Sequence, residues 1–160
     1  MTIARKLNTF LTEHHADFEL IAHEPTHSSR ETASVCRVPA WQMAKAVLLD
    51  TEQDYLLAVL PTDRRVELAE LRSDLGTKPR LVDETRLVRI FDDCEFGALP
   101  ALGSGYGVAT IIDDSLDDAP DIYFEAGDHA SLVHMSGAEF GRLTSAARRG
   151  HFSDARPSPM

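Results

Sequence analysis

Apolar residues follow a helical period at the start of the chain and strand-like runs soon afterwards. Four apolar positions between Ile3 and Leu11 recur at spacings of three and four, which predicts an amphipathic helix over residues 2–15. Alternation over residues 18–22 predicts a short first strand. Ser28 with a glutamate three residues later matches a capping box, so we expect a short helix to begin there. Pro39 suits the first turn of another short helix.

The strongest β signal is a pair of apolar runs over residues 46–49 and 55–60. The polar segment between them is short, which predicts a hairpin with both strands buried. A helix is expected over residues 66–75, because Gly76 can end it in a left-handed conformation. Asp83 is a candidate N-cap for the next helix.

The second half of the chain opens with a glycine-rich segment over residues 96–107, which predicts a loop because it holds four glycines. The elements expected after it are strands over 108–112, 122–125 and 132–135, and a last helix over 137–147.

Helices and strands do not alternate regularly along the chain. This order favours a mixed α/β fold with a largely antiparallel sheet or a barrel-like core. The length of 160 residues fits one domain. We expect residues 1–150 to form that domain and residues 151–160 to be a flexible C-terminal tail.

Composition is ordinary for a globular protein, with 43% hydrophobic and 26% charged residues. No apolar run reaches the ~18 residues that a membrane span needs. The N-terminus lacks the apolar core of a signal peptide, so we expect a cytoplasmic protein with no membrane partner. Cys36 and Cys94 are far apart and predict neither a disulfide framework nor a zinc site.

The net charge of −10 argues against a protein that holds nucleic acid through its phosphates alone. It is compatible with an enzyme that touches only the end of an RNA. Five aspartates crowd between residues 113 and 121, and we interpret this run as a solvated turn.

Two features could carry chemistry. Lys45 stands at the start of the first hairpin strand, where its ammonium could meet a phosphate or a polarised carbonyl. The alternative is an edge lysine that reaches to water. In the 97–107 loop, glycines would let backbone N–H groups approach a ligand closely. The alternative is a purely structural loop, and its spacing is not that of a nucleotide-binding P-loop.

The histidines form no metal-binding motif in the sequence, and Ser104 is not in a nucleophile elbow. We therefore expect no metal and no cofactor. His23 and His27 flank a proline and are better suited to contact substrate or solvent.

Taken in order, several segments resemble the YbaK/ProX family of aminoacyl-tRNA editing domains, which includes domains associated with prolyl-tRNA synthetase. The resemblance covers about residues 3–145, and its segments are 23–27, 44–49, 55–61, 97–100 with Gly103, and 122–129. It implies a curved, mostly antiparallel sheet packed by helices. It also implies a deacylase that acts on mischarged tRNA in trans, with prolyl-tRNA as the usual beneficiary.

The resemblance further implies the site residues. Lys45 would lie near the terminal adenosine and its phosphate, Gly97 would offer backbone groups to the aminoacyl end, and Asp128 would lie at the pocket. The attacking water would be oriented largely by the substrate. The residues expected to bind the substrate are His23, His27, Pro100, Gly103 and His129.

The hypothesis is therefore a metal-independent ester hydrolase that deacylates Ala-tRNA(Pro) or Cys-tRNA(Pro). The partners would be the aminoacylated 3′ end of tRNA and an aminoacyl-tRNA synthetase, and the default assembly is a monomer. Cationic tRNA contacts could come from Arg64, Arg65, Lys78 and Arg80. Alternatives are a non-catalytic regulatory module that binds a nucleotide or a tRNA end, and a metal-dependent hydrolase that uses the histidines.

Overall fold

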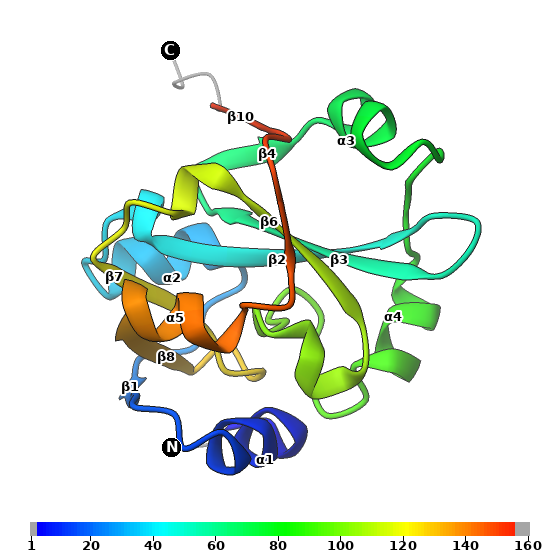
Figure 1. Ribbon diagram of the computed structural model, residues 1–160. Coiled ribbons are helices and arrows are strands. Elements are labelled where there is room, and N and C mark those ends of the chain that lie inside the picture. The colour runs from blue at the N-terminus through cyan, green and yellow to red at the C-terminus, as the bar shows by residue number, and fades with distance from the viewer. Residues whose placement is uncertain (1–2, 156–160) are drawn as a thin grey trace.

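A mixed eight-stranded sheet forms the centre of the computed structural model, which describes residues 3–155 (Figure 1). Its strands, in spatial order, are β1 (Glu19–Ala22), β8 (Ser131–Ser136), β7 (Asp121–Glu125), β2 (Met43–Asp50), β3 (Tyr55–Pro61), β6 (Ala109–Asp113) and β9 (Arg148–Gly150), and β5 (Arg80–Leu81) also pairs with β2. The pairs β2–β7, β3–β6 and β6–β9 are parallel, and the other pairs in this sheet are antiparallel. The predicted mixed α/β fold is confirmed.

The predicted hairpin is β2–β3, in which Asp50 pairs with Tyr55 across the turn. Strand β3 is buried from Leu56 to Pro61, because it lies between β2 and β6 with apolar clusters on both of its faces. Leu57 and Val59 point into one cluster, whereas alternate residues such as Leu60 point into the other. This explains why β3 is a continuous apolar run in the sequence.

Helices cover both faces of the sheet (Figure 1). The larger cluster takes apolar side chains from α1 (Arg5–Glu13), α4 (Glu84–Ile90) and α5 (Gly137–Leu143). A second cluster includes Leu71 of α3 (Leu68–Leu75), and a third includes Ala33 of α2 (Ser29–Val35). The helices within residues 3–155 are too short and too polar to cross a bilayer.

Three predicted helix boundaries are confirmed. The Ser28 hydroxyl accepts from the Glu31 N–H at 3.1 Å, and the Asp83 carboxylate accepts from the Arg86 N–H at 2.9 Å. Gly76 ends α3 with φ +71°. Pro39 precedes the short 3-10 helix η1 (Ala40–Gln42). Helix α5 ends at Leu143, earlier than the predicted residue 147, and the chain continues into β9.

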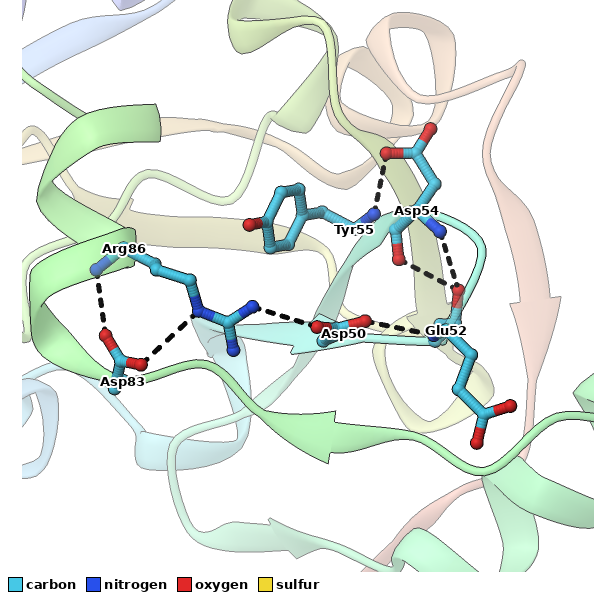
Figure 2. A network of polar contacts seen from close by, with 7 residues as sticks. Asp50, Glu52, Asp54, Tyr55, Asp83 and Arg86 are labelled. Carbon is cyan, nitrogen blue, oxygen red and sulfur yellow. Dashed lines mark hydrogen bonds and ion pairs between the residues drawn. The ribbon is translucent and has the colours of Figure 1, made fainter.

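Arg86 fastens α4 to the hairpin (Figure 2). Its guanidinium donates to Asp50 at 3.0 Å and to Asp83 at 3.3 Å, and lies 5.9 Å from the centre of the Tyr55 ring. The Glu52 N–H and the Arg86 guanidinium hold the pKa of Asp50 below its usual value. The bridge holds α4 at the Asp50 end of β2.

Residues 151–155 belong to the fold, so the predicted tail begins too early. The Phe152 side chain is 0% exposed within the second apolar cluster. Strand β10 (Ser153–Ala155) pairs with β4 (Arg64–Val66) in a separate two-stranded sheet. Residues 156–160 lie outside the described residues.

Asp113 holds this C-terminal segment in place, and it corrects the interpretation of the acidic run as wholly solvated. Its buried carboxylate accepts from the Phe152 N–H and the Ser153 hydroxyl, both at 2.8 Å, and from Ser115. Burial alone would raise the pKa of Asp113, but these hydrogen bonds outweigh it and lower the pKa. Phe152 and Ser153 lie 39 and 40 residues later in the sequence, so local pattern could not predict this role.

We predict that Phe152→Ala lowers the free energy of unfolding by about 3–5 kcal/mol, because it leaves a cavity in a buried cluster. Urea denaturation measures the change. Asp154→Ala, at an exposed position two residues further along the chain, is the control and should alter stability by less than about 0.5 kcal/mol. Equal stability of the two variants would mean that the C-terminal segment does not pack as described.

Candidate functional site

The sheet has a local break along β2. One edge of β2 pairs with β3 from Ala44 to Asp50. The other edge pairs with β7 only at residues 43–44 and with β5 only at residues 49–50. Within the described chain, residues 45–48 therefore have no strand pairing on this side, although the Leu48 carbonyl accepts from the Val82 N–H at 3.2 Å. Such an edge presents backbone polar groups and leaves room beside the strand.

A cavity of about 310 Å³ occupies part of this break. It brings together the 23–27 segment, β2 and the glycine loop, which are far apart in the sequence. Its lining residues are His27, Ser28, Ser29, Arg30, Lys45, Ala46, Thr62, Gly97 and Leu99. Three of the predicted site residues, namely Lys45, His27 and Gly97, thus meet in one cavity.

Lys45 is the third residue of β2 and is half-buried. Its strand lies inside the sheet, and the side chain lines the cavity at the break. Lys45 is therefore not on an outer edge strand of the sheet, as the alternative interpretation required. A cationic group in a partly desolvated cavity attracts an anion more strongly than it would at an open surface.

Gly97 is in the left-handed region, with φ +83°. A Cβ built on Gly97 would lie 3.3 Å from Cε1 of the His129 ring, so the close approach of the ring also favours glycine. His129 Nε2 donates to the Phe96 carbonyl at 2.6 Å. Because a carbonyl only accepts, Nε2 carries a proton. His129 therefore ties the 126–130 turn to the glycine loop.

The 23–27 segment is bonded to that same turn. The backbone N–H of His23 donates to the Ala130 carbonyl at 2.9 Å, and the N–H of Thr26 donates to the His129 carbonyl at 3.1 Å. Asp128, within the turn, accepts from the Ala130 N–H at 2.9 Å. The turn therefore supports two segments of the site. His23, Asp128 and His129 are not among the residues that line the cavity.

Pro100 and Gly103 do not line the cavity. Pro100 is buried, and Gly103 begins the 3-10 helix η2 (Gly103–Tyr106). A Cβ on Gly103 would lie only 2.6 Å from the Val108 carbonyl oxygen and would collide with the Thr110 hydroxyl. Glycine at position 103 therefore has a packing reason of its own.

The cationic residues suggested as tRNA contacts also lie outside the lining. Arg64 donates to the hydroxyl and the carbonyl of Ser153 at 2.6 and 3.0 Å, so it serves the C-terminal strand. Arg65 lies 3.8 Å from Glu67, and Lys78 and Arg80 are exposed.

Arg30 and Thr62 are among the lining residues that sequence inspection missed. Arg30, in the first turn of α2, adds a second cation to the cavity. Thr62 follows β3, is 1% exposed, and its hydroxyl oxygen has no hydrogen-bond partner among residues 3–155. The capping box correctly predicted where α2 begins, but it did not indicate that Arg30 lines the same cavity as Lys45. No local pattern distinguishes Thr62.

Glu125 was missed as well. The last pairs of β2 with β7 are Met43 with Tyr123 and Ala44 with Phe124, so the next residues along these parallel strands are Lys45 and Glu125. Their side chains leave the same face of the sheet. The buried carboxyl group of Glu125 thus stands beside the strand that carries the cavity lysine.

The Glu125 carboxyl group is 1% exposed, and neither oxygen has a hydrogen-bond partner among the described residues. The nearby Thr32 hydroxyl is within hydrogen-bond distance of the Ser28 carbonyl, at 3.0 Å, and of the Thr26 hydroxyl, at 2.5 Å. Burial raises the pKa of Glu125 to about 7, with the Thr32 hydroxyl and His129 lowering it and Asp128 raising it by smaller amounts.

The cavity can bind an anion and hold a water molecule, because it combines two cations with hydroxyl groups. Its lining contains no serine–histidine–aspartate arrangement. The group of potential metal ligands found among the described residues is Asp113, Asp114 and His151, which lies outside this cavity. Four donor groups, from Ser115, Phe152 and Ser153, already occupy the Asp113 carboxylate.

The chain belongs to the aminoacyl-tRNA editing domain family, whose sequence profile matches residues 23–143. It is similar to the multifunctional Ser/Thr-tRNA deacylase ProXp-y of Escherichia coli K12, with 25% identity over 150 residues that cover 87% of this chain and 86% of that protein. The predicted family is confirmed, and with it the enzyme class of an aminoacyl-tRNA deacylase.

Solved structures show the same fold. A hypothetical protein, APE2540, matches with a TM-score of 0.83 and 18% identity over 94% of this chain and all of the other (100%). A proposed trans-editing enzyme for prolyl-tRNA synthetase matches with a TM-score of 0.82 and 17% identity over 95% of this chain and 97% of the other.

We predict that Glu125→Gln increases the stability of the protein, compared with the parent protein at the same pH, by more at pH 8 than at pH 4. The unfolded carboxyl group ionises near 4.5 and the folded one near 7, so the free energy of unfolding falls between these pH values. The loss amounts to about 3 kcal/mol and is absent in the glutamine variant. Urea denaturation at several pH values measures it.

The exposed Glu70 provides the control, because Glu70→Gln removes one carboxylate without touching the buried site. If the difference between Glu125→Gln and the parent protein is the same at pH 4 and pH 8, Glu125 does not titrate between them in the folded state.

Proposed function

We propose that this protein is a free-standing deacylase that hydrolyses mischarged tRNA in trans, with Ala-tRNA(Pro) and Cys-tRNA(Pro) as first substrates. The observation that carries the proposal is the cavity at the break in the sheet, where Lys45, Arg30 and Gly97 meet in a chain of the editing-domain family. The tRNA would enter by its 3′ end.

The two cations suit the phosphates of the terminal nucleotides. Lys45 offers a compact charge and Arg30 a planar guanidinium, and both are known partners of phosphate oxygens. The net charge of −10 makes extended contact with the RNA backbone unfavourable, so binding would be confined to the end of the strand. Lys45 acts in this proposal as a positioning residue and not as a nucleophile.

In the reaction, water attacks the ester carbonyl carbon, and the bond to the ribose oxygen breaks. The products are the free amino acid and a tRNA with its terminal hydroxyl restored. An ester is already activated, so positioning a water molecule and stabilising one oxyanion can supply the remaining several kcal/mol. The unpartnered Thr62 hydroxyl is our candidate for orienting the water, together with the substrate's own ribose hydroxyl.

Gly97 and Asp128 complete the proposed site. Without a side chain, Gly97 lets the aminoacyl end approach the backbone of the loop. Asp128 is kept as a candidate because its turn is bonded to that loop through His129. His23, Pro100, Gly103 and His129 would then act by shaping the loops and not by touching the reacting atoms.

The substrate set must be tested broadly. The Escherichia coli relative is named for seryl- and threonyl-tRNA, whereas one structural relative is named for prolyl-tRNA synthetase. All four amino acids under consideration, namely alanine, cysteine, serine and threonine, are small. A transient complex with prolyl-tRNA synthetase is the partner interaction that this proposal adds.

We predict ester loss from at least one mischarged tRNA in a panel of Ala-tRNA(Pro), Cys-tRNA(Pro), Ser-tRNA and Thr-tRNA species. Lys45→Ala should lower kcat/KM roughly 10- to 150-fold, the amount expected for a lost hydrogen bond to a charged group. Arg72→Ala removes an exposed cation outside the cavity and should leave the rate unchanged. Release of labelled amino acid measures both.

Binding of the same tRNAs without hydrolysis would instead indicate a non-catalytic module on this fold. Equal deacylation rates for the parent protein and Lys45→Ala would show that Lys45 does not contribute to the site.

We further predict that dialysis against a chelator leaves the deacylation rate unchanged, because the cavity lining carries a single imidazole and no carboxylate. Atomic absorption before and after dialysis confirms the metal content. A rate that falls with the metal and returns with added zinc would favour the metal-dependent alternative.

A further inference from the structure

A second cavity of about 250 Å³ continues from the first along the break in the sheet. The two cavities share Ala46, Gly97 and Leu99. The side chains that line the second cavity are all apolar, and its lining residues are Ala46, Val47, Leu48, Leu81, Val82, Leu87, Phe96, Gly97 and Leu99. A cationic compartment and an apolar compartment therefore adjoin at these three residues.

Two large apolar side chains of this cavity are exposed to water. Phe96 is 56% exposed and Leu81 is 65% exposed. Single exposed apolar residues are common, but here both belong to one concave site that adjoins the candidate active site. Phe96 also precedes Gly97, and its carbonyl accepts from His129 at 2.6 Å, so the backbone that carries the ring is held in place.

Resting on the proposed function, we propose that the apolar cavity binds the terminal nucleobase of the tRNA, and that Phe96 is the surface on which this base stacks. The substrate end has an anionic phosphate and a flat, uncharged base on the same nucleotide. The paired compartments match that pair of groups, because Lys45 and Arg30 line one cavity and Phe96 lines the other.

The size of the cavity favours a base over the amino acid side chain. At roughly 30 Å³ for each water molecule, 250 Å³ has room for about eight waters. The side chain of alanine, serine, cysteine or threonine would displace only a few of these and leave the rest of an apolar cavity hydrated. A bicyclic purine displaces more water and presents two apolar faces to Phe96 and the aliphatic wall.

The lining also explains how such a site would tolerate different tRNAs. It holds no side chain that donates or accepts a hydrogen bond, so no side chain of the lining would read the edge of the base. Aromatic side chains bind single-stranded bases through stacking, which every base can provide. Discrimination among amino acids would then have to come from the neighbouring polar cavity.

The experiment compares the binding of two uncharged RNA minihelices by fluorescence anisotropy. One ends in CCA, and the other ends in CC followed by an abasic ribose 5′-phosphate, so the two differ only in the terminal base. For the parent protein we expect the CCA minihelix to bind roughly 5- to 150-fold more tightly. Phe96→Ala should abolish this preference, whereas Phe96→Trp should retain it.

Val88→Ala provides the matched control, because Val88 is exposed apolar surface on the neighbouring helix but does not line the cavity. It should keep the full preference. Equal binding of the two minihelices by the parent protein would overturn the proposal, as would a preference that survives in Phe96→Ala.

Deacylation kinetics separate this proposal from the function on which it rests. Phe96→Ala should raise KM by the same factor for every mischarged tRNA that the protein hydrolyses, with little change in kcat. A factor that depends on the amino acid would assign the cavity to the aminoacyl side chain and overturn base binding. If no tRNA is hydrolysed, the deacylase proposal fails, while a base preference that depends on Phe96 would still support this inference.

Discussion

The pairing of β2 is the constraint on which the site depends. Strand β2 is bonded to β3 along its length but is covered on its other edge only at its two ends, by β7 and by β5. The residues between those ends, 45–48, contribute to both cavities. An interior strand with a local open edge provides a rigid support and a space beside it, which a fully paired strand or an outer edge strand would not provide together.

Loops complete the site, and a small set of hydrogen bonds connects them. The 126–130 turn holds the 23–27 segment through backbone bonds and the glycine loop through the His129 ring. Gly97 is positioned by a support outside the cavity, so residues behind the lining can affect activity without touching a substrate. This arrangement accounts for His129 and His23 lying near the site but outside its lining.

Charge is used sparingly. The chain is acidic as a whole, yet Lys45 and Arg30 bring two cations to one cavity. Behind them, the unpartnered Glu125 carboxyl group is held largely protonated below neutral pH, because burial disfavours its charged form. A protein that grips only the last nucleotides of an RNA needs a local attraction and not a basic surface.

Local sequence pattern determined most of the secondary structure of this protein, because helix caps, the apolar hairpin and Gly76 act over a few residues. The segments that resemble a known family indicated Lys45, His27 and Gly97, which the fold brings together in one cavity. Only the tertiary structure decided the rest. Thr62 and Glu125 stand out because their buried side chains have oxygen atoms without hydrogen-bond partners among the described residues. Asp113 and Phe152 stand out because they are in contact although some forty residues separate them in the sequence. The break along β2 depends on which strands pair and where each pairing ends, and such long-range registers leave no mark in local periodicity.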